Sequence, residues 1–193
     1  MRKVAVTGGL AAGKSTVCRL LQEFGAYVVS ADEIVRRQLT PATPTGQYVI
    51  DLLGPGIITN NQIDRKKVSD IVFSDPSKLK ALEMILHPIV RDEVMSQFEK
   101  IKDSDAYSFF VAEIPLLDEA KMRGDFDAVI AVVCREQIAR ERALNKKEFD
   151  RRSRFQLSQS AKQARADYVI VNDGDLAALK KEIGKLIPKL KGD

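Results

Sequence analysis

Apolar positions follow two different periodicities along this chain. Short, nearly continuous apolar runs of strand length occupy residues 3–7, 27–30, 107–114, 128–134 and 168–171. Between them, apolar residues recur every three or four positions, which is typical of helices with one buried face. Strands that are apolar on both faces suit a parallel sheet covered by helices on both sides. The pattern predicts an α/β fold with a five-stranded parallel sheet in three layers.

The first helix follows the first apolar run closely. Its apolar positions take the spacing i, i+3, i+4 and i+7 and are Val17, Leu20, Leu21 and Phe24. Gly25 comes next and is a typical helix stop. A second group of helical spacings, from Val68 to Val94, predicts a helical subdomain at about residues 60–100. A charged helical stretch at residues 137–162 and an amphipathic helix over residues 176–190 complete the predicted elements.

No internal repeat or low-complexity linker divides the chain, so residues 1–193 are predicted to form a single domain with two helical appendages. Its 31 basic and 27 acidic residues give a net charge of +4, which fits nucleic acid or a polyanionic small substrate equally well. Because no zinc-finger or RNP motif accompanies the charge, we expect no nucleic-acid partner. The oligomeric state stays open.

Cysteine spacing and hydropathy bear on the location of the protein. Cys18 and Cys134 lie far apart and form no C-x-x-C pair, so neither a metal site nor a disulfide framework is predicted. No apolar run approaches the roughly 18 to 20 residues of a membrane helix. The first apolar run is also too short for the apolar region of a signal peptide. We therefore expect a cytoplasmic protein without a membrane partner.

A glycine-rich segment connects the first predicted strand to the first helix. It reads Gly8-Gly9-Leu10-Ala11-Ala12-Gly13-Lys14-Ser15 and fits the phosphate-binding pattern G-x-x-x-x-G-K-S/T in the context that this pattern requires. Glycines let the backbone wrap a phosphate, and amides at the helix start add positive charge. Lys14 is predicted to reach the β and γ phosphates of ATP, and the Ser15 hydroxyl to coordinate Mg²⁺. The predicted nucleotide-binding residues are Gly8, Gly9, Ala11, Ala12, Gly13, Lys14, Ser15 and Thr16.

Other classes of phosphate-loop protein fit the sequence less well. Residues 145–148 (NKKE) end in Glu where a guanine-reading motif needs Asp, and residues 51–54 (DLLG) lie in a predicted helix-to-loop region rather than at a strand end. A motor ATPase needs a strand that ends in Asp, whereas the third predicted strand ends near Glu113. A small kinase is the favoured class.

Further sequence pieces extend the pattern over nearly the whole chain. They are Thr7-Gly8-Gly9, Ala31-Asp32, Leu39-Thr40-Pro41, Ile63-Asp64-Arg65, Val72-Phe73, Ile85-Leu86-His87-Pro88, Ile114-Pro115-Leu116-Leu117 with Glu119, Gln137 with Arg140, and residues 166–172 (ADYVIVN). As a set they resemble the dephospho-coenzyme A kinase family. The resemblance implies transfer of the γ-phosphoryl group of ATP to the 3′-hydroxyl of dephospho-CoA, the final step of coenzyme A synthesis. It also implies strand order 2-3-1-4-5, a helical acceptor-binding domain and a lid near residues 137–162.

Asp32 is the candidate for activating the acceptor. It follows the second predicted strand, and ligands of parallel α/β sheets bind at the carboxyl edge of the strands. A carboxylate there can orient the ribose hydroxyl, although an ordinary helix N-cap is the alternative. The family usually has Asp-Ala-Asp at this place, whereas this chain has Ser30-Ala31-Asp32, so any role of the first carboxylate in holding water around Mg²⁺ is in doubt.

Three further residues are assigned with alternatives. Arg65 offers a planar fork for the acceptor's pyrophosphate, or is a solvated charge at a helix start. His87, the single histidine, contacts the acceptor according to the resemblance, or is structural. Arg140 in the predicted lid stabilises the transferring phosphoryl group, or forms an ion pair with Glu136. The family often has a further arginine where this chain has Leu144, which leaves Arg142, Arg151, Arg152 or Arg154 as substitutes.

Glu113 either orients Mg²⁺-bound water or pairs with a cation. The predicted catalytic residues are thus Lys14, Asp32 and Arg140, the acceptor-binding residues Asp32, Arg65 and His87, and the metal-binding residue Ser15.

Two other functions compete with this prediction. Another metabolite kinase, such as a nucleoside monophosphate kinase, would share the phosphate loop and the lid, and a non-catalytic nucleotide or nucleic-acid binding module would explain the positive charge.

Overall fold

The chain divides into two compact units in the computed structural model, which describes residues 1–191. The first unit combines Met1–Ser30 with the chain from Ser96 onward, and the second is Ala31–Met95. The helical unit therefore begins well before residue 60, where the helical spacings had suggested its start. None of the helices in residues 1–191 combines the length and apolar character needed to span a bilayer.

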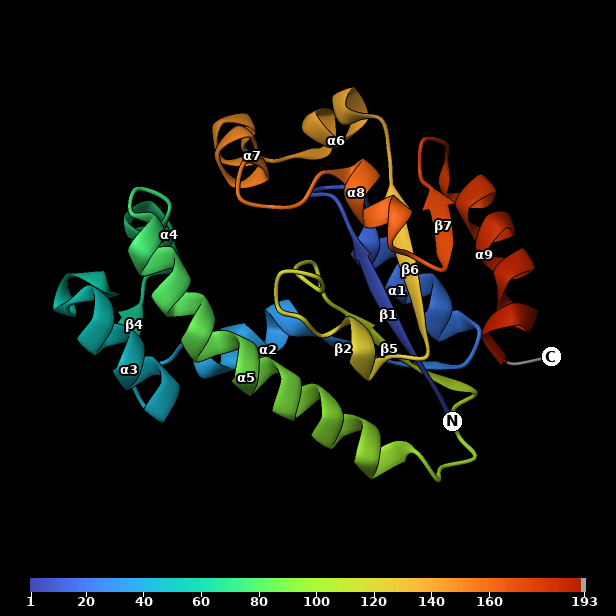
Figure 1. The fold of residues 1–193 in the computed structure, drawn as a ribbon, viewed down its shortest axis with the longest axis horizontal. Coiled ribbons are helices and arrows are strands. Elements are labelled where there is room, and N and C mark those ends of the chain that lie inside the picture. Colours follow the sequence, from blue (N-terminus) through green and yellow to red (C-terminus); the bar gives the residue numbers. More distant parts are fainter. Residues whose placement is uncertain (192–193) are drawn as a thin grey trace. The chain divides into compact units, whose positions relative to one another are not determined.

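A five-stranded parallel sheet forms the centre of the first unit (Figure 1). Its strands are β1 (Arg2–Gly8), β2 (Ala26–Ser30), β5 (Phe109–Glu113), β6 (Ala128–Val133) and β7 (Tyr168–Val171). They lie in the order β2-β5-β1-β6-β7, which is 2-3-1-4-5 when only the strands of this sheet are numbered. The predicted fold class and strand order are thus confirmed.

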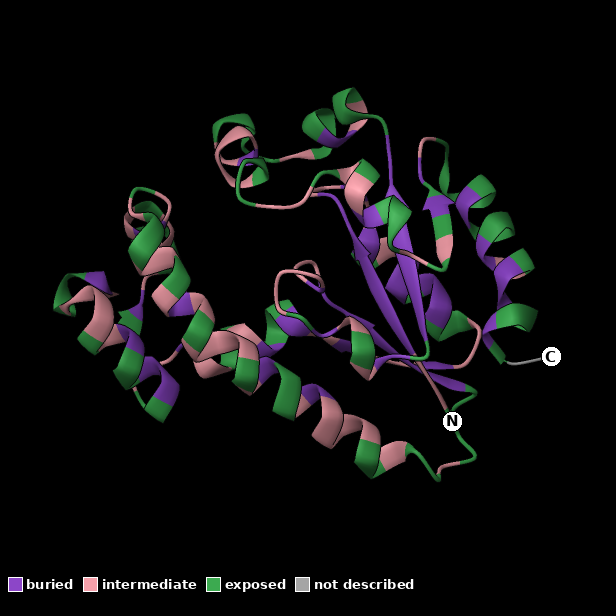
Figure 2. Cartoon of the chain, in the orientation of Figure 1, coloured by how far each residue is buried: buried purple, intermediate pink, exposed green. Residues whose placement is uncertain are grey.

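Helices α1 (Lys14–Glu23) and α9 (Leu176–Lys191) pack on one face of the sheet. Their apolar residues, including Leu21 and Ile183, join Val4 and Val6 of β1 in one core cluster. Gly25, in a left-handed conformation with φ 91°, follows α1 and turns the chain into β2. Figure 2 shows the three central strands β1, β5 and β6 as almost wholly buried, which explains why their sequences are apolar without alternation, whereas the edge strands β2 and β7 are only partly buried.

The opposite face is covered from a different part of the chain. Successive side chains of a strand point to opposite faces, so Phe110 of β5 lies on the face away from Val111. The Phe110 ring stacks with Tyr27 of β2, their centroids 6.1 Å apart, and meets Phe98 edge-on at 5.4 Å. Phe98 belongs to the last turns of α5 (Pro76–Ile101), so the end of this helix helps to close the core of the first unit.

Between β6 and β7 the chain forms three short helices. They are α6 (Glu136–Arg142), α7 (Lys146–Ser153) and α8 (Gln159–Ala164). Only Ala139 of α6 and Phe149 of α7 are buried, whereas α8 contacts β6 and β1. We call α6, α7 and their flanking loops, residues 135–156, the lid arm. Its helices are those that the charged stretch at residues 137–162 predicted.

The second unit is helical and has its own apolar core, which includes Val49, Ile57 and Val68. Its elements are α2 (Ala31–Gln38), α3 (Pro44–Leu53), the 3-10 turn η1 (Pro55–Ile57), β3 (Ile58–Thr59), β4 (Gln62–Ile63), α4 (Arg65–Val72) and most of α5. The hairpin β3–β4 turns through Asn60 and Asn61, both with positive φ, a conformation that Asn tolerates. Periodicity did not predict this hairpin because each strand has only two residues.

Candidate active site

The glycine-rich loop runs from the end of β1 to the start of α1, as the pattern requires. Gly8 has φ 144°, and a Cβ atom at this position would lie 2.1 Å from the carbonyl oxygen of Val132. Gly13 has φ 95°, and a Cβ there would lie 2.2 Å from Nδ2 of Asn172. Both positions therefore need glycine for two reasons, the left-handed backbone and the lack of space.

Ala11 is the unusual residue of this loop. Its φ is 55°, so an alanine adopts the left-handed conformation that glycine takes without strain. The cost is about 1 to 2 kcal/mol for an L-residue. Such local strain, held in place by the surrounding fold, is common where a backbone is shaped to receive a ligand.

Lys14 begins α1 and is nearly buried, with 8% of its surface exposed. Its ammonium group donates to the carbonyl oxygens of Gly8 at 3.3 Å and Gly9 at 2.8 Å. The side chain thus folds back over the loop, and its charge lies beside the backbone that would surround a phosphate. The role of Lys14 in phosphate binding stays a prediction.

Ser15 and Glu113 meet at the carboxyl ends of the strands. The Ser15 hydroxyl donates to Oε1 of Glu113 at 2.8 Å, and Glu113, the last residue of β5, is 7% exposed. A hydroxyl and a carboxylate are the hard oxygen ligands that suit Mg²⁺. Residues 1–191 contain no group of three or more metal-binding side chains, and Mg²⁺ on a nucleotide needs only one or two protein oxygens. The residues present therefore fit this ion.

Asn172 supports the loop from the neighbouring strand. It follows β7, is 6% exposed, and donates its side-chain amide to the carbonyl oxygen of Ala12 at 2.9 Å. Its own backbone carbonyl oxygen accepts from Arg142 at 2.9 Å. The sequence piece ADYVIVN contained Asn172, but no periodicity indicated that it lies against the loop.

Cys18 lies on α1 behind the loop. Burial raises the pKa of its thiol well above the ordinary value, Glu113 raises it further, and Lys14 opposes the shift. The thiol is therefore protonated and is part of the core rather than a nucleophile.

Arg140 lies on the lid arm and is half exposed. One guanidinium nitrogen donates to Oδ2 of Asp150 at 2.8 Å, so α6 and α7 are linked by an ion pair. Its partner is thus Asp150 rather than Glu136, which the helical spacing had offered as the alternative. A hollow of about 430 Å³ on the lid arm is lined by Glu136, Gln137, Arg140, Glu141 and Lys146.

The acceptor-binding candidates all belong to the second unit. Asp32 is the second residue of α2 and is exposed, Arg65 is the first residue of α4 and is exposed, and His87 lies within α5 and is half-buried. Asp32 lies inside the first helical turn rather than at an N-cap. The roles of these three residues stay predictions.

The two GTPase-like fragments have ordinary structural roles. Asn145 caps α7, its side-chain oxygen accepting from the Glu148 amide at 3.1 Å. Residues 51–54 form the end of α3, and Gly54 caps it with φ 88°. Each fragment therefore serves a helix end, as expected from its place outside the strand ends.

The strand order, the glycine-rich loop after β1 and the lysine at the head of α1 together define a P-loop nucleotide-binding protein. The comparisons with known proteins narrow the class. The sequence profile described as dephospho-CoA kinase matches residues 2–178. A dephospho-CoA kinase of Protochlamydia amoebophila is 45% identical, with 99% of this chain and 97% of that protein covered. The chain therefore belongs to the dephospho-CoA kinase family and is an ATP-dependent phosphotransferase.

Solved structures agree with this assignment. The dephospho-CoA kinase from Campylobacter jejuni superposes with a TM-score of 0.70 at 26% identity, covering 98% of this chain and 96% of that one. A shikimate kinase from Acinetobacter baumannii superposes with a TM-score of 0.58 at 18% identity, covering 100% and 96% of the two chains. The second likeness shows the fold alone.

Proposed function

We propose that this kinase transfers the γ-phosphoryl group of ATP to the 3′-hydroxyl of dephospho-CoA. The observation that carries the proposal is the phosphate loop, with Lys14 folded over the Gly8 and Gly9 carbonyls, in a chain that matches this family over residues 2–178. The loop supports ATP binding, and the family match supports the choice of acceptor.

Within the first unit, the loop amides and Lys14 bind the phosphates of ATP, and Ser15 with Glu113 would hold Mg²⁺. When bound, Mg²⁺ neutralises charge on the phosphate oxygens. Arg140 exchanges Asp150 for the transferring phosphoryl group and stabilises its charge. Because phosphoryl transfer depends mainly on positioning and charge, these groups supply most of the catalysis.

The second unit binds the acceptor. Asp32 orients the attacking hydroxyl and receives its proton, Arg65 binds the pyrophosphate of dephospho-CoA, and His87 contacts the acceptor. The start of α2 suits Asp32 for this role because it is exposed and follows β2 directly. We place the reaction in the cytoplasm, since both cysteines are free thiols.

An acceptor panel tests the proposal. Purified protein with Mg²⁺-ATP is given dephospho-CoA, nucleoside monophosphates and shikimate in separate reactions, and mass spectrometry reports which acceptor gains a phosphate. We expect product with dephospho-CoA, and Asp32→Asn should lower kcat by about 10²-fold, the lower end of the usual contribution of a general base. Product with a nucleoside monophosphate and none with dephospho-CoA would refute the proposed acceptor.

A further inference from the structure

Lys162 is a buried charge that the candidate active site does not use. Among residues 1–191 the buried charged residues are Lys14, Glu113 and Lys162, and the first two belong to the phosphate loop and its neighbour. Lys162 is only 1% exposed, although it lies on the six-residue helix α8. Taking an ammonium group out of water costs several kcal/mol of desolvation free energy, so contacts with its partners need to offset about that amount.

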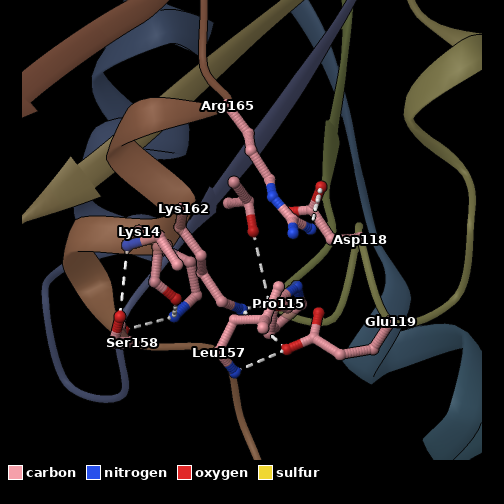
Figure 3. Close-up of polar contacts among 12 residues, drawn as sticks. Lys14, Pro115, Asp118, Glu119, Leu157, Ser158, Lys162 and Arg165 are labelled. Carbon is pink, nitrogen blue, oxygen red and sulfur yellow. Dashed lines mark hydrogen bonds and ion pairs between the residues drawn. The ribbon is translucent and has the colours of Figure 1, made fainter.

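Two partners meet the ammonium group of Lys162 (Figure 3). It donates to the carbonyl oxygen of Pro115 and pairs with Oε1 of Glu119 at 3.4 Å, both from the loop that follows β5. The Pro115 carbonyl also accepts from the Thr7 hydroxyl at 3.3 Å, immediately before the phosphate loop. Nearby, Arg165 pairs with Asp118 at 3.5 Å. Lys162 thus joins α8 to the loop after β5 and, through one shared carbonyl, to β1.

Glu119 and α8 also contact the chain at both ends of the lid arm. Where the arm ends, the amide of Leu157 donates to Oε1 of Glu119 at 2.9 Å, the oxygen that also pairs with Lys162. Just before the arm begins, the amide of Cys134 donates to the side chain of Gln159 on α8 at 2.9 Å. The arm therefore leaves and returns at residues fixed by α8 and Glu119. We call Pro115, Glu119, Gln159 and Lys162 the lid anchor.

The lid anchor also touches the phosphate loop. A Cβ atom on Gly9 would lie 2.7 Å from Cγ and 2.8 Å from Cδ of Gln159, so this side chain packs directly on the Gly9 backbone. Gln159 precedes Lys162 by three residues and lies about one helical turn away. A displacement of α8 would consequently move Gln159 off Gly9 and release Cys134 in the same step.

Charge balance makes the anchor dependent on Lys162. Burial lowers the pKa of the Lys162 ammonium from its ordinary value, while the Glu119 carboxylate opposes that shift. Oε2 of Glu119 is buried and has no hydrogen-bond partner within the described chain. Removing Lys162 would leave the negative charge of Glu119 without its cation: Oε1 would keep only the Leu157 amide of these two contacts, and Oε2 would still have no hydrogen-bond partner.

We propose that Lys162, acting with Glu119, is a positioning residue for phosphoryl transfer, because it holds α8 so that both ends of the lid arm and Gln159 keep their places beside the phosphate loop. The inference rests on the proposed function for its kinetic test. Lys162 itself is 1% exposed, and its ammonium group contacts Pro115 and Glu119 inside the protein. Its effect passes through the placement of the lid arm, which carries Arg140.

The test compares Lys162→Met with Lys180→Met in the full chain. Lys180 pairs with Glu23 at 2.6 Å on the surface of the same unit, so this control removes an ammonium and breaks a Lys–Glu pair away from the lid arm. At a temperature where circular dichroism shows both variants fully folded, we expect kcat with dephospho-CoA to fall about tenfold in Lys162→Met and to stay unchanged in Lys180→Met. Hydrogen–deuterium exchange should accelerate in residues 135–156 of Lys162→Met alone.

Wild-type kcat and wild-type lid-arm exchange in Lys162→Met would overturn the inference, as would equal losses in the two variants. If Lys162→Met does not fold, the double variant Glu119→Gln/Lys162→Met replaces it, because it removes both charges and leaves no unpaired carboxylate; wild-type kcat in this double variant would overturn the inference. Lys162→Arg should recover most of the activity. A wild-type protein inactive on dephospho-CoA would refute the proposed function, while the exchange measurement would still test the anchor.

Discussion

The phosphate loop and the lid arm bind the same end of a nucleotide in this proposal, yet they are built in opposite ways. The loop is backbone held inside the core, because a side chain at Gly8 would collide with β6 and one at Gly13 with the side chain of Asn172. The lid arm is two short helices with one buried residue each, and its charged residues are exposed or half-buried. One region is therefore fixed by sterics, and the other by a few polar contacts at its ends.

This difference separates the two charges that we propose to be catalytic. Lys14 is nearly buried and donates to two loop carbonyls, so its position is set by the fold. Arg140 is half exposed, and its pair with Asp150 is a surface ion pair, worth about 0 to 1 kcal/mol. Arg140 can therefore leave Asp150 for a phosphate at little cost, which suits a residue that acts only when the lid arm is in place.

The largest expected effect is on the loop side of the comparison. Lys14→Ala removes the ammonium that is proposed to contact the phosphates, and we expect kcat/KM with ATP to fall by about 10² to 10³-fold, the loss typical of one preorganised donor. Steady-state kinetics measures it, with Lys180→Ala as a folded control that lacks an exposed lysine. Undiminished turnover in Lys14→Ala would mean that the loop does not hold the transferring phosphoryl group.

A smaller effect is expected on the lid side. Arg140→Met keeps much of the length of the side chain but removes the charge, and kcat should fall by about 10 to 100-fold because the developing charge loses one partner. Asp150→Asn weakens the competing pair without touching Arg140, so KM for ATP should fall about twofold. If Asp150→Asn lowers kcat as much as Arg140→Met does, Asp150 orients Arg140 during transfer, and the proposed exchange of partners is wrong.

The smallest expected effect is on the rates at which the two thiols react with a reagent, and it involves no change in enzyme activity. Burial raises the pKa of both Cys18, behind the loop, and Cys134, before the lid arm, so at pH 8 each has less reactive thiolate than a free cysteine. With a disulfide reagent we expect Cys134 to react slowly and Cys18 more slowly still, both faster as the pH rises. Cys134→Ser isolates the Cys18 signal. If Cys18 and Cys134 react with the reagent at equal rates, the expected difference in rigidity between the phosphate loop and the lid arm is wrong.

Sequence patterns predicted the fold well where the physics is local. The strands and α1 were found because their apolar spacing records which faces are buried, and the phosphate loop because its glycines are required by its own backbone. The hairpin β3–β4 was missed since strands of two residues leave no measurable period. In the lid, the helical spacing offered Glu136 as a partner for Arg140, but the contact is with Asp150 on the next helix.

By itself, then, the sequence determined the class of protein, the phosphate loop and the helical character of the charged stretch at residues 137–162. Only the tertiary structure decided that Lys162 meets Glu119, that Asn172 supports Ala12, and that Gln159 lies on Gly9. Glu119 and Lys162 are separated by more than forty residues, and Ala12 and Asn172 by 160. Hydrophobic periodicity reports the face that a residue presents, whereas these pairs depend on which loops the strand order brings to the same edge of the sheet.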